Sequence, residues 1–216
     1  RKIPGLVTGA ALISVLAVGL LSYVEAARSM RGAVENKLSA LLDARQDTLS
    51  AYLGTIHEDL TVIAANTETR QALAAFEGGF AALRRTGDAK ARLQDVYIAA
   101  NPNPAGRKDE LNAADDGSAY STDHGRFHPW FREILHARGY YDLFLISPAG
   151  DVIYSVFKEN DFATNLDTGP WKQSGLADVF RRARAAARPG ATAFADFAAY
   201  APSNGAAASF IAAPVM

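Results

Sequence analysis

Cysteine is absent from this chain of 216 residues, which excludes disulfide bonds and thiolate metal sites. Charge of one sign is also lacking, because 22 Lys and Arg oppose 23 Asp and Glu, a net charge of -1. The chain therefore has no basic footprint, and we expect no nucleic-acid partner. A Gly-x-Ser-x-Gly motif and a phosphate-binding glycine loop are missing as well. We therefore expect that the protein is not an enzyme and that it uses no cofactor.

A long apolar run is what the sequence does have near its beginning. Residues Pro4–Val24 carry no charge, with Arg1 and Lys2 before them and Glu25 after them. The run matches the roughly 20 residues that a helix needs to cross a bilayer. Residues 1–25 thus predict a transmembrane helix with a short cytoplasmic N-terminus, because basic flanks tend to stay inside. A cleaved signal peptide is the alternative, although its apolar core is usually only about 7–15 residues long.

The next fifty residues predict one long amphipathic helix over 26–75. No proline interrupts them, and apolar residues recur every three or four positions, which is typical of one helical face. Such a helix would be roughly 75 Å long. It is either a passive stalk or a signalling helix that packs against the same helix of a second subunit, and we expect a homodimer through it. The apolar positions are Met30, Val34, Leu38, Leu41, Leu49, Tyr52, Ile56, Leu60 and Ile63.

Residues 76–138 predict a helical and loop region. Gly78-Gly79 should end the long helix, and Asn101-Pro102 should end helical structure again. We expect short helices at 80–85, 89–100 and 128–137, with a long loop over 101–128.

Residues 139–216 predict a sheet region. Strands at 140–147 and 152–157 flank a turn containing Pro148 and Gly150, a good hairpin signal. A loop over 158–170, a helix over 176–187 and strands at 192–197 and 208–215 should follow. The order favours an α+β domain with an antiparallel sheet and helices on one face. The sequence stops within the last strand, so we expect a fragment of a longer protein.

Five segments in this order resemble the extracytoplasmic sensor region of bacterial methyl-accepting chemotaxis proteins. The resemblance is to a Cache-like (PAS-like) sensor domain on a long membrane-emergent helix, and it covers almost the whole chain. The segments are Asp116–Tyr120, His128–Arg132, Gly139–Leu145, Val156–Glu159 with Asp161–Leu166, and Tyr200–Ser203 with Ala208–Ile211.

The resemblance implies a receptor in the bacterial inner membrane whose sensor region lies in the periplasm or outside the cell. It implies a small-molecule ligand and downstream cytoplasmic signalling proteins reached through an output domain. Similar sensors also precede histidine kinases and nucleotide cyclases. The chain lacks a second span, a HAMP segment and a methylated helical hairpin, so the resemblance does not decide between these outputs.

Ligands of Cache-like sensors usually bind between the sheet and the segment that covers it, here residues 158–171. Small-molecule pockets are mostly apolar with a few placed polar groups. Tyrosines and Trp171 would supply walls, Asp196 would pair with an ammonium group, and Arg132 or Lys158 with a carboxylate. The alternative is that the aromatic residues are core and the charges are solvated. The candidate ligand-binding residues are Arg132, Tyr141, Tyr154, Lys158, Trp171, Asp196 and Tyr200.

Two function classes compete with the sensor. A membrane-tethered hydrolase would use a metal or nucleophile site near His124 and His128, and a structural stalk would bind no ligand. The two histidines would share a helix face, but Pro129 disfavours a helix there, and no HExxH spacing is present. Helix capping and hydrogen bonds in the loop explain these residues better. The acidic neighbours in this set are Asp115, Asp116 and Asp123.

Overall fold

The computed structural model describes residues 3–216 and divides the chain into two compact units. These are Arg1–Thr55 and Ile56–Met216. Arg1 and Lys2, on which the predicted orientation in the membrane depends, lie outside the described residues.

The first unit consists of most of helix α1, which spans Ile3–Ala65 in 63 residues without a break. Its large apolar side chains are exposed, from Leu6 through Leu21 to Leu53. Hydroxyl side chains such as Ser14 return their hydrogen bonds to the carbonyl four residues earlier, so they leave no unpaired donor. By length and composition the helix is able to cross a membrane, as the apolar run predicts.

Helix α1 ends at Ala65, ten residues earlier than expected. Asn66 has extended backbone angles, and its side-chain oxygen accepts a hydrogen bond from the Glu68 N–H at 2.8 Å. This cap begins α2 (Thr67–Thr86), because the first turn of a helix has unpaired N–H groups.

The predicted break at Gly78-Gly79 is wrong, because α2 continues through both glycines to Thr86. A Cβ atom on Gly79 would lie 2.9 Å from Tyr120 Cα, whereas one on Gly78 would meet nothing within 4 Å. Gly79 therefore permits a close approach of α2 to α4 and does not terminate the helix.

Helix α4 (Ala119–Arg138) begins nine residues before the expected start at His128. The prediction of a loop over 101–128 is therefore wrong for its last part, which is helical. The Ser118 hydroxyl caps it by accepting from the Ser121 N–H at 3.1 Å. Pro129 lies inside the helix and removes one backbone donor. Burial of Phe127 and Phe131 on the same helix offsets that loss. Between α2 and α4 lie α3 (Ala89–Gln94), a π-helical turn (Asp95–Ala99) and a 3-10 turn (Lys108–Glu110).

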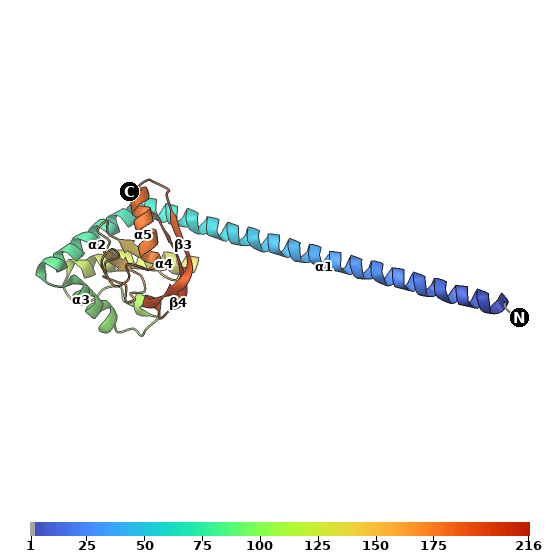
Figure 1. The fold of residues 1–216 in the computed structure, drawn as a ribbon. Coiled ribbons are helices and arrows are strands. Elements are labelled where there is room, and N and C mark those ends of the chain that lie inside the picture. Colours follow the sequence, from blue (N-terminus) through green and yellow to red (C-terminus); the bar gives the residue numbers. More distant parts are fainter. Residues whose placement is uncertain (1–2) are drawn as a thin grey trace. The chain divides into compact units, whose positions relative to one another are not determined.

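The strands form two separate antiparallel pairs where one sheet was expected. β1 (Phe144–Ile146) pairs with β2 (Val152–Ser155), and β3 (Ala193–Tyr200) pairs with β4 (Ala206–Ala212). Helix α5 (Gly175–Ala186) lies along the β3–β4 hairpin (Figure 1). A 3-10 turn at Ala201–Ser203 connects β3 to β4. The described chain is thus a mixed α and β protein with small antiparallel sheets and one long N-terminal helix.

Strand β2 lies between two hydrophobic clusters and is buried along its whole length. Ile153 and Tyr154 belong to the cluster built mainly from α2 and α4, whereas Val152 belongs to the cluster around α5 and β3. Main-chain and side-chain groups next to β2 are therefore far from water, and each polar one needs a partner.

The contact of Gly79 with α4 gives a stability prediction. Replacing Gly79 with Ala should destabilise the fold by about 1–3 kcal/mol, because the new methyl group overlaps the Tyr120 backbone. Gly78→Ala is the matched control and should stabilise α2 by up to about 1 kcal/mol, because alanine favours helix. Denaturant unfolding followed by tryptophan fluorescence measures both, and equal effects of the two variants would contradict the packing of α2 on α4.

Candidate functional site

The candidate site is built around the segment Lys158–Trp171, here called the cover segment, which runs beside β2. The Ala163 N–H donates to the Val152 carbonyl at 3.0 Å, and the Val152 N–H donates to the Thr164 carbonyl at 2.8 Å. Lys158 and Ala163 have φ angles of 57° and 63°, in the left-handed region that non-glycine residues rarely adopt. Such strain of about 1–3 kcal/mol per residue is found where the surroundings enforce a conformation, often at functional sites.

Asp142 fixes the entrance of the cover segment. Its carboxylate accepts hydrogen bonds from the N–H groups of Val156 at 2.9 Å and Phe157 at 3.2 Å. It also accepts from the Ser155 hydroxyl at 2.7 Å. Burial raises the pKa of Asp142, and the charge of Asp161 raises it further. Asp142 is therefore a half-buried acid that organises the chain immediately after β2.

Lys158 is buried although it carries an ammonium group. Its Nζ donates to the Val156 carbonyl at 3.0 Å and lies 5.1 Å from the Tyr154 ring centre and 5.7 Å from that of Tyr97. These rings provide cation–π contacts. Among the described residues Lys158 forms no ion pair, and burial lowers its pKa.

Asp161 connects the cover segment to the end of β3. Its Oδ2 accepts a hydrogen bond from the Tyr200 hydroxyl at 2.5 Å, but its Oδ1 has no partner among the described residues. Burial raises the pKa of Asp161 to about 6. Glu159 makes a parallel connection, because it accepts from the hydroxyls of Ser203 and, at 2.7 Å, Tyr141. Two acids thus hold the β3–β4 turn against the cover segment.

A stack of two histidines lies against Tyr154 of β2. The His124 and His128 ring centres are 4.3 Å apart. His128 Nε2 donates to the Asp109 carbonyl at 2.6 Å, so its Nδ1 accepts from the Tyr154 hydroxyl at 2.7 Å. His124 Nδ1 lies 2.5 Å from the Asn112 carbonyl, and its Nε2 has no partner in the described part of the chain. Burial lowers the pKa of both rings, so both are neutral.

The argument that Pro129 prevents a helix at these histidines is wrong, because both project from α4. Within residues 3–216, however, no three His, Asp or Glu side chains are placed to hold a metal ion. The histidines belong to an aromatic core that includes Phe76, Tyr97 and Tyr120.

Three of the seven predicted ligand-binding residues come together at the buried site. Tyr154 and Lys158 are in direct contact, and Tyr200 bonds to Asp161, three residues after Lys158. Trp171 is half-buried at the end of the cover segment, and its Nε1 donates to the Asn160 carbonyl at 3.2 Å.

The other three predicted residues lie further out. Tyr141 is 62% exposed and bonds to Glu159. Arg132 donates to the Asp109 carbonyl at 3.1 Å, the same carbonyl that accepts from His128. Asp196 is exposed, and its carboxylate accepts from the N–H of its own neighbour Phe197 at 2.7 Å.

The last turns of α1, which belong to the second unit, bond to both flanks of this site. Asp59 accepts from the Tyr140 hydroxyl at 2.7 Å and pairs with Arg138 at 3.0 Å, immediately before Tyr141 and Asp142. His57 Nδ1 lies 3.0 Å from the Thr192 hydroxyl, just before β3 begins. The end of α1 therefore contacts the chain leading to β1 and the chain leading to β3.

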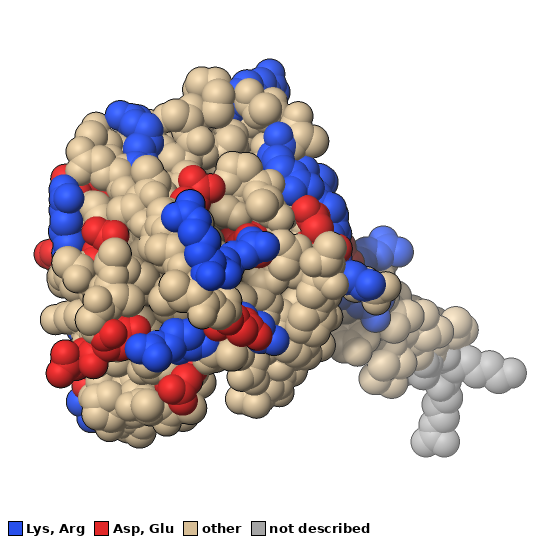
Figure 2. All heavy atoms as spheres, turned by 90° about the vertical axis from the view of Figure 1, so that its left-hand side faces the viewer, with Lys and Arg blue, Asp and Glu red and all other residues tan. Residues whose placement is uncertain are grey.

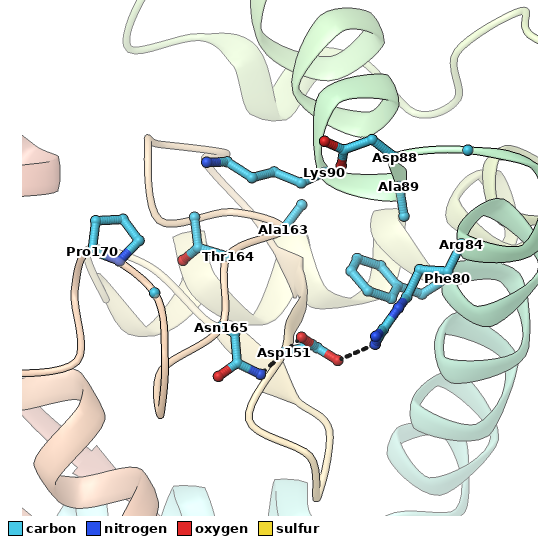
Figure 3. A pocket seen from close by; sticks show the side chains of 12 residues that line it. Phe80, Arg84, Asp88, Ala89, Lys90, Asp151, Ala163, Thr164, Asn165 and Pro170 are labelled. Atoms are coloured by element: carbon cyan, nitrogen blue, oxygen red, sulfur yellow. Dashed lines mark hydrogen bonds and ion pairs between the residues drawn. The ribbon is translucent and has the colours of Figure 1, made fainter.

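An open surface groove of about 350 Å³ lies between α2 and the cover segment (Figure 3). Its central polar groups satisfy one another, because Asp151 accepts from Arg84 at 3.1 Å and from Asn165 at 2.9 Å. On the face shown in Figure 2, acidic and basic side chains alternate without an extended patch of one sign. The buried polar atoms without a partner among the described residues, on Thr69, His124 and Asp161, do not line this groove.

No known protein-family model, curated protein or solved structure matches the chain.

Sequence reasoning missed Asp142, Glu159, Asp161 and Asp59. The signal available for three of them was an acid next to aromatic residues: Asp142 follows Tyr141, and Glu159 and Asp161 lie between Phe157 and Phe162. Acids in such runs are either turn residues or buried polar anchors, and only the fold decides which. Asp59 carried no distinct signal, because it lies on an ordinary amphipathic helix.

The raised pKa of Asp161 gives a pH prediction. A carboxyl group that binds its proton more tightly when folded stabilises the fold below the pH at which the unfolded group titrates. That stability is lost as the pH rises through about 6. The stability of Asp161→Asn relative to the native chain should therefore rise between pH 4 and pH 7, by roughly 2 kcal/mol. Urea unfolding at several pH values measures the difference. Asp196→Asn, at an exposed acid, should show no such trend, and parallel curves for Asp161→Asn would contradict the assignment.

Proposed function

We propose that this chain is the extracytoplasmic ligand-sensing region of a bacterial transmembrane receptor of the chemoreceptor type. In this proposal the second unit is a Cache-like, PAS-like sensor, and α1 anchors it in the inner membrane. A small molecule binds between the cover segment and the neighbouring β3–β4 turn.

The observation that carries the proposal is the continuity of α1 with the bonds at the flanks of the site. Helix α1 contains both the apolar run and, in its last turns, residues His57 and Asp59. Asp59 bonds beside the Asp142 anchor, and His57 bonds beside the strand that bears Tyr200. A change in spacing between these two flanks would act on the end of α1 directly.

The chemistry of the cover segment supports a binding role. One acid, Asp161, and one lysine, Lys158, are buried there with strained backbone at Lys158 and Ala163, an arrangement that costs stability. Costly polar groups retained near a covering segment are expected where a ligand compensates for them. Hydrogen bonds from hydroxyls to carboxylates join the cover segment to the β3–β4 turn. A polar ligand can replace each of these bonds with one of its own.

The proposed mechanism is a shift between two arrangements. A ligand moves the equilibrium only by the difference in its affinity for the two states. Binding at the cover segment would favour one spacing of the β3–β4 turn against β2, and Asp59 and His57 would transfer it to α1. A homodimer through the apolar stripe of α1 would then carry the change across the membrane to cytoplasmic signalling proteins. A histidine kinase or a nucleotide cyclase is an equally compatible output.

The hydrolase hypothesis has no specific observation in its favour. His128 uses both ring nitrogens in hydrogen bonds, and both histidines are fully buried among aromatic rings. A general base must reach the proton that it removes from a substrate. The hydrogen-bonded nitrogens of these two rings instead bond to groups of the protein itself.

The proposal predicts that a small metabolite stabilises the protein. The full chain in detergent micelles would be screened by thermal unfolding against amino acids, amines, organic acids and purines. At 100 times its dissociation constant, a ligand should stabilise the fold by about 2.7 kcal/mol, or roughly 5–11 °C for a protein of this size.

The two tryptophans provide a matched pair that locates the binding. Trp171→Ala removes an aromatic side chain from the cover segment and should abolish the thermal shift. Trp130→Ala removes a half-buried tryptophan from α4 and should keep it. A folded chain that responds to no compound, or a response lost only with Trp130→Ala, would contradict the proposal.

A further inference from the structure

Lys158 is the most unusual charged side chain of the second unit. It is only 1% exposed, and its Nζ donates to a single protein group, the Val156 carbonyl at 3.0 Å. An ammonium group carries three N–H donors, and no carboxylate of the described residues lies close enough to form an ion pair with this one. A buried charge without a counter-charge is costly, so the neutral amine is the form that fits this position.

The groups around Nζ do not supply the missing charge. The rings of Tyr154 and Tyr97 lie beside it, and the two stacked histidines are neutral. The charges of Asp142 and Asp109 favour the ammonium form, and that of Arg132 opposes it. Burial is the largest effect and lowers the pKa of this amine. The titratable and charged groups that face it are Tyr97, Asp109, His124, His128, Arg132, Asp142 and Tyr154.

The backbone of Lys158 connects this amine to the start of the cover segment. Its φ angle of 57° lies in the left-handed region, and its N–H donates to the Ser155 hydroxyl oxygen at 2.8 Å. The side chain can reach water only if the residue turns, because Nζ is also bonded to the carbonyl of Val156, two residues earlier. Such a turn would relieve the strained angle and would carry the following residues 159–162 with it.

We propose that Lys158 is a proton-operated switch, which keeps the cover segment closed as a neutral amine and releases residues 158–162 when it binds a proton. The step is the transfer of one proton from water to the lone pair of Nζ. A ligand shifts an equilibrium by its difference in affinity for the two states, and a proton binds the solvated amine of the released state more tightly. This inference goes beyond the proposed sensor function, because the switch needs no small molecule.

The released residues carry bonds that hold the β3–β4 turn. Two acids among them, Glu159 and Asp161, accept hydrogen bonds from hydroxyls at this turn. The strand that leads into the turn begins beside the residue that contacts His57 of α1. Protonation of the amine would therefore loosen the flank of the site that is connected to the end of α1.

Hydrogen–deuterium exchange of the full chain in detergent, read by mass spectrometry, measures how often the cover segment opens. The suitable window lies between about pH 8 and about pH 9.5, where Asp142 and Asp161 are ionised and a solvated lysine is still protonated. After correction for the intrinsic pH dependence of exchange, the opening constant of residues 158–162 should rise about tenfold for each unit by which the pH falls. Helix α5 should show no such trend, because the switch is local.

Two variants at the same position fix the charge. Lys158→Met is apolar and of similar length, and its cover segment should stay closed without dependence on pH. Lys158→Arg is charged throughout the window, and its cover segment should exchange rapidly at every pH, so it keeps the test decisive if Lys158→Met fails to fold. Lys172→Met, at an exposed lysine directly after the cover segment, is the matched control and should keep the native trend.

The outcomes separate the switch from the sensor proposal. An opening constant of the native chain that does not change with pH would overturn the switch, and so would a trend that persists in either Lys158 variant. The same trend in α5 would overturn it too, because unfolding of the whole unit would then explain the exchange. A trend that only the Lys158 variants remove supports the switch even if no metabolite binds, whereas the sensor proposal stands or falls with the metabolite screen.

Discussion

The burial of charged side chains beside β2 is the constraint on which the rest of the second unit depends. Asp161 and Lys158 are buried and Asp142 is half-buried, and no ion pair among the described residues neutralises any of them. Each must then be satisfied by hydrogen bonds, since an unpaired buried charge costs several kcal/mol. Asp142 achieves this with the backbone after β2, and Asp161 only in part, with Tyr200. These bonds hold the cover segment and the β3–β4 turn in place.

Helix packing brings the parts of that site together. Gly79 allows α2 to approach α4 closely, and α4 in turn supplies the aromatic and histidine core on which Tyr154 lies. The same α4 leads through Tyr140 into β1, and Asp59 of α1 accepts a hydrogen bond from the Tyr140 hydroxyl. A site at the cover segment and the end of α1 are thus connected through few residues, which is what a sensor linked to its anchor by one helix requires.

Local signals predicted several elements well. The turn around Pro148 and Gly150 lies between β1 and β2, and α5 begins one residue from its predicted start. The sequence also carried a signal for the end of α1, because Asn66 before Thr67 and Glu68 is a typical helix start. The continuing apolar period concealed it. Both patterns are local, so the sequence around residue 66 contained the information that ends the helix.

Other features depend on contacts between distant segments and could not be predicted. Gly79 suggests a helix end until Tyr120 is known to lie against it, and Pro129 suggests a boundary until burial of its neighbours compensates for the lost bond. Whether four strands form one sheet or two is decided by pairing across the whole domain. The same holds for the site: Asp196 and Asp161 are equally plausible acids in the sequence, and only the fold buries one and exposes the other.

A sensor of this kind requires that binding at the cover segment reaches α1 and its dimer partner. Because the chain has no cysteine, a single Leu49→Cys on the apolar stripe reports disulfide formation between two copies in membrane vesicles. Asp47→Cys, about 200° around the helix, is the matched control. The account predicts that Leu49→Cys cross-links, that Asp47→Cys does so far less, and that a stabilising compound changes the Leu49→Cys rate. Equal cross-linking at both positions, or a Leu49→Cys rate that the bound compound leaves unchanged, would contradict it.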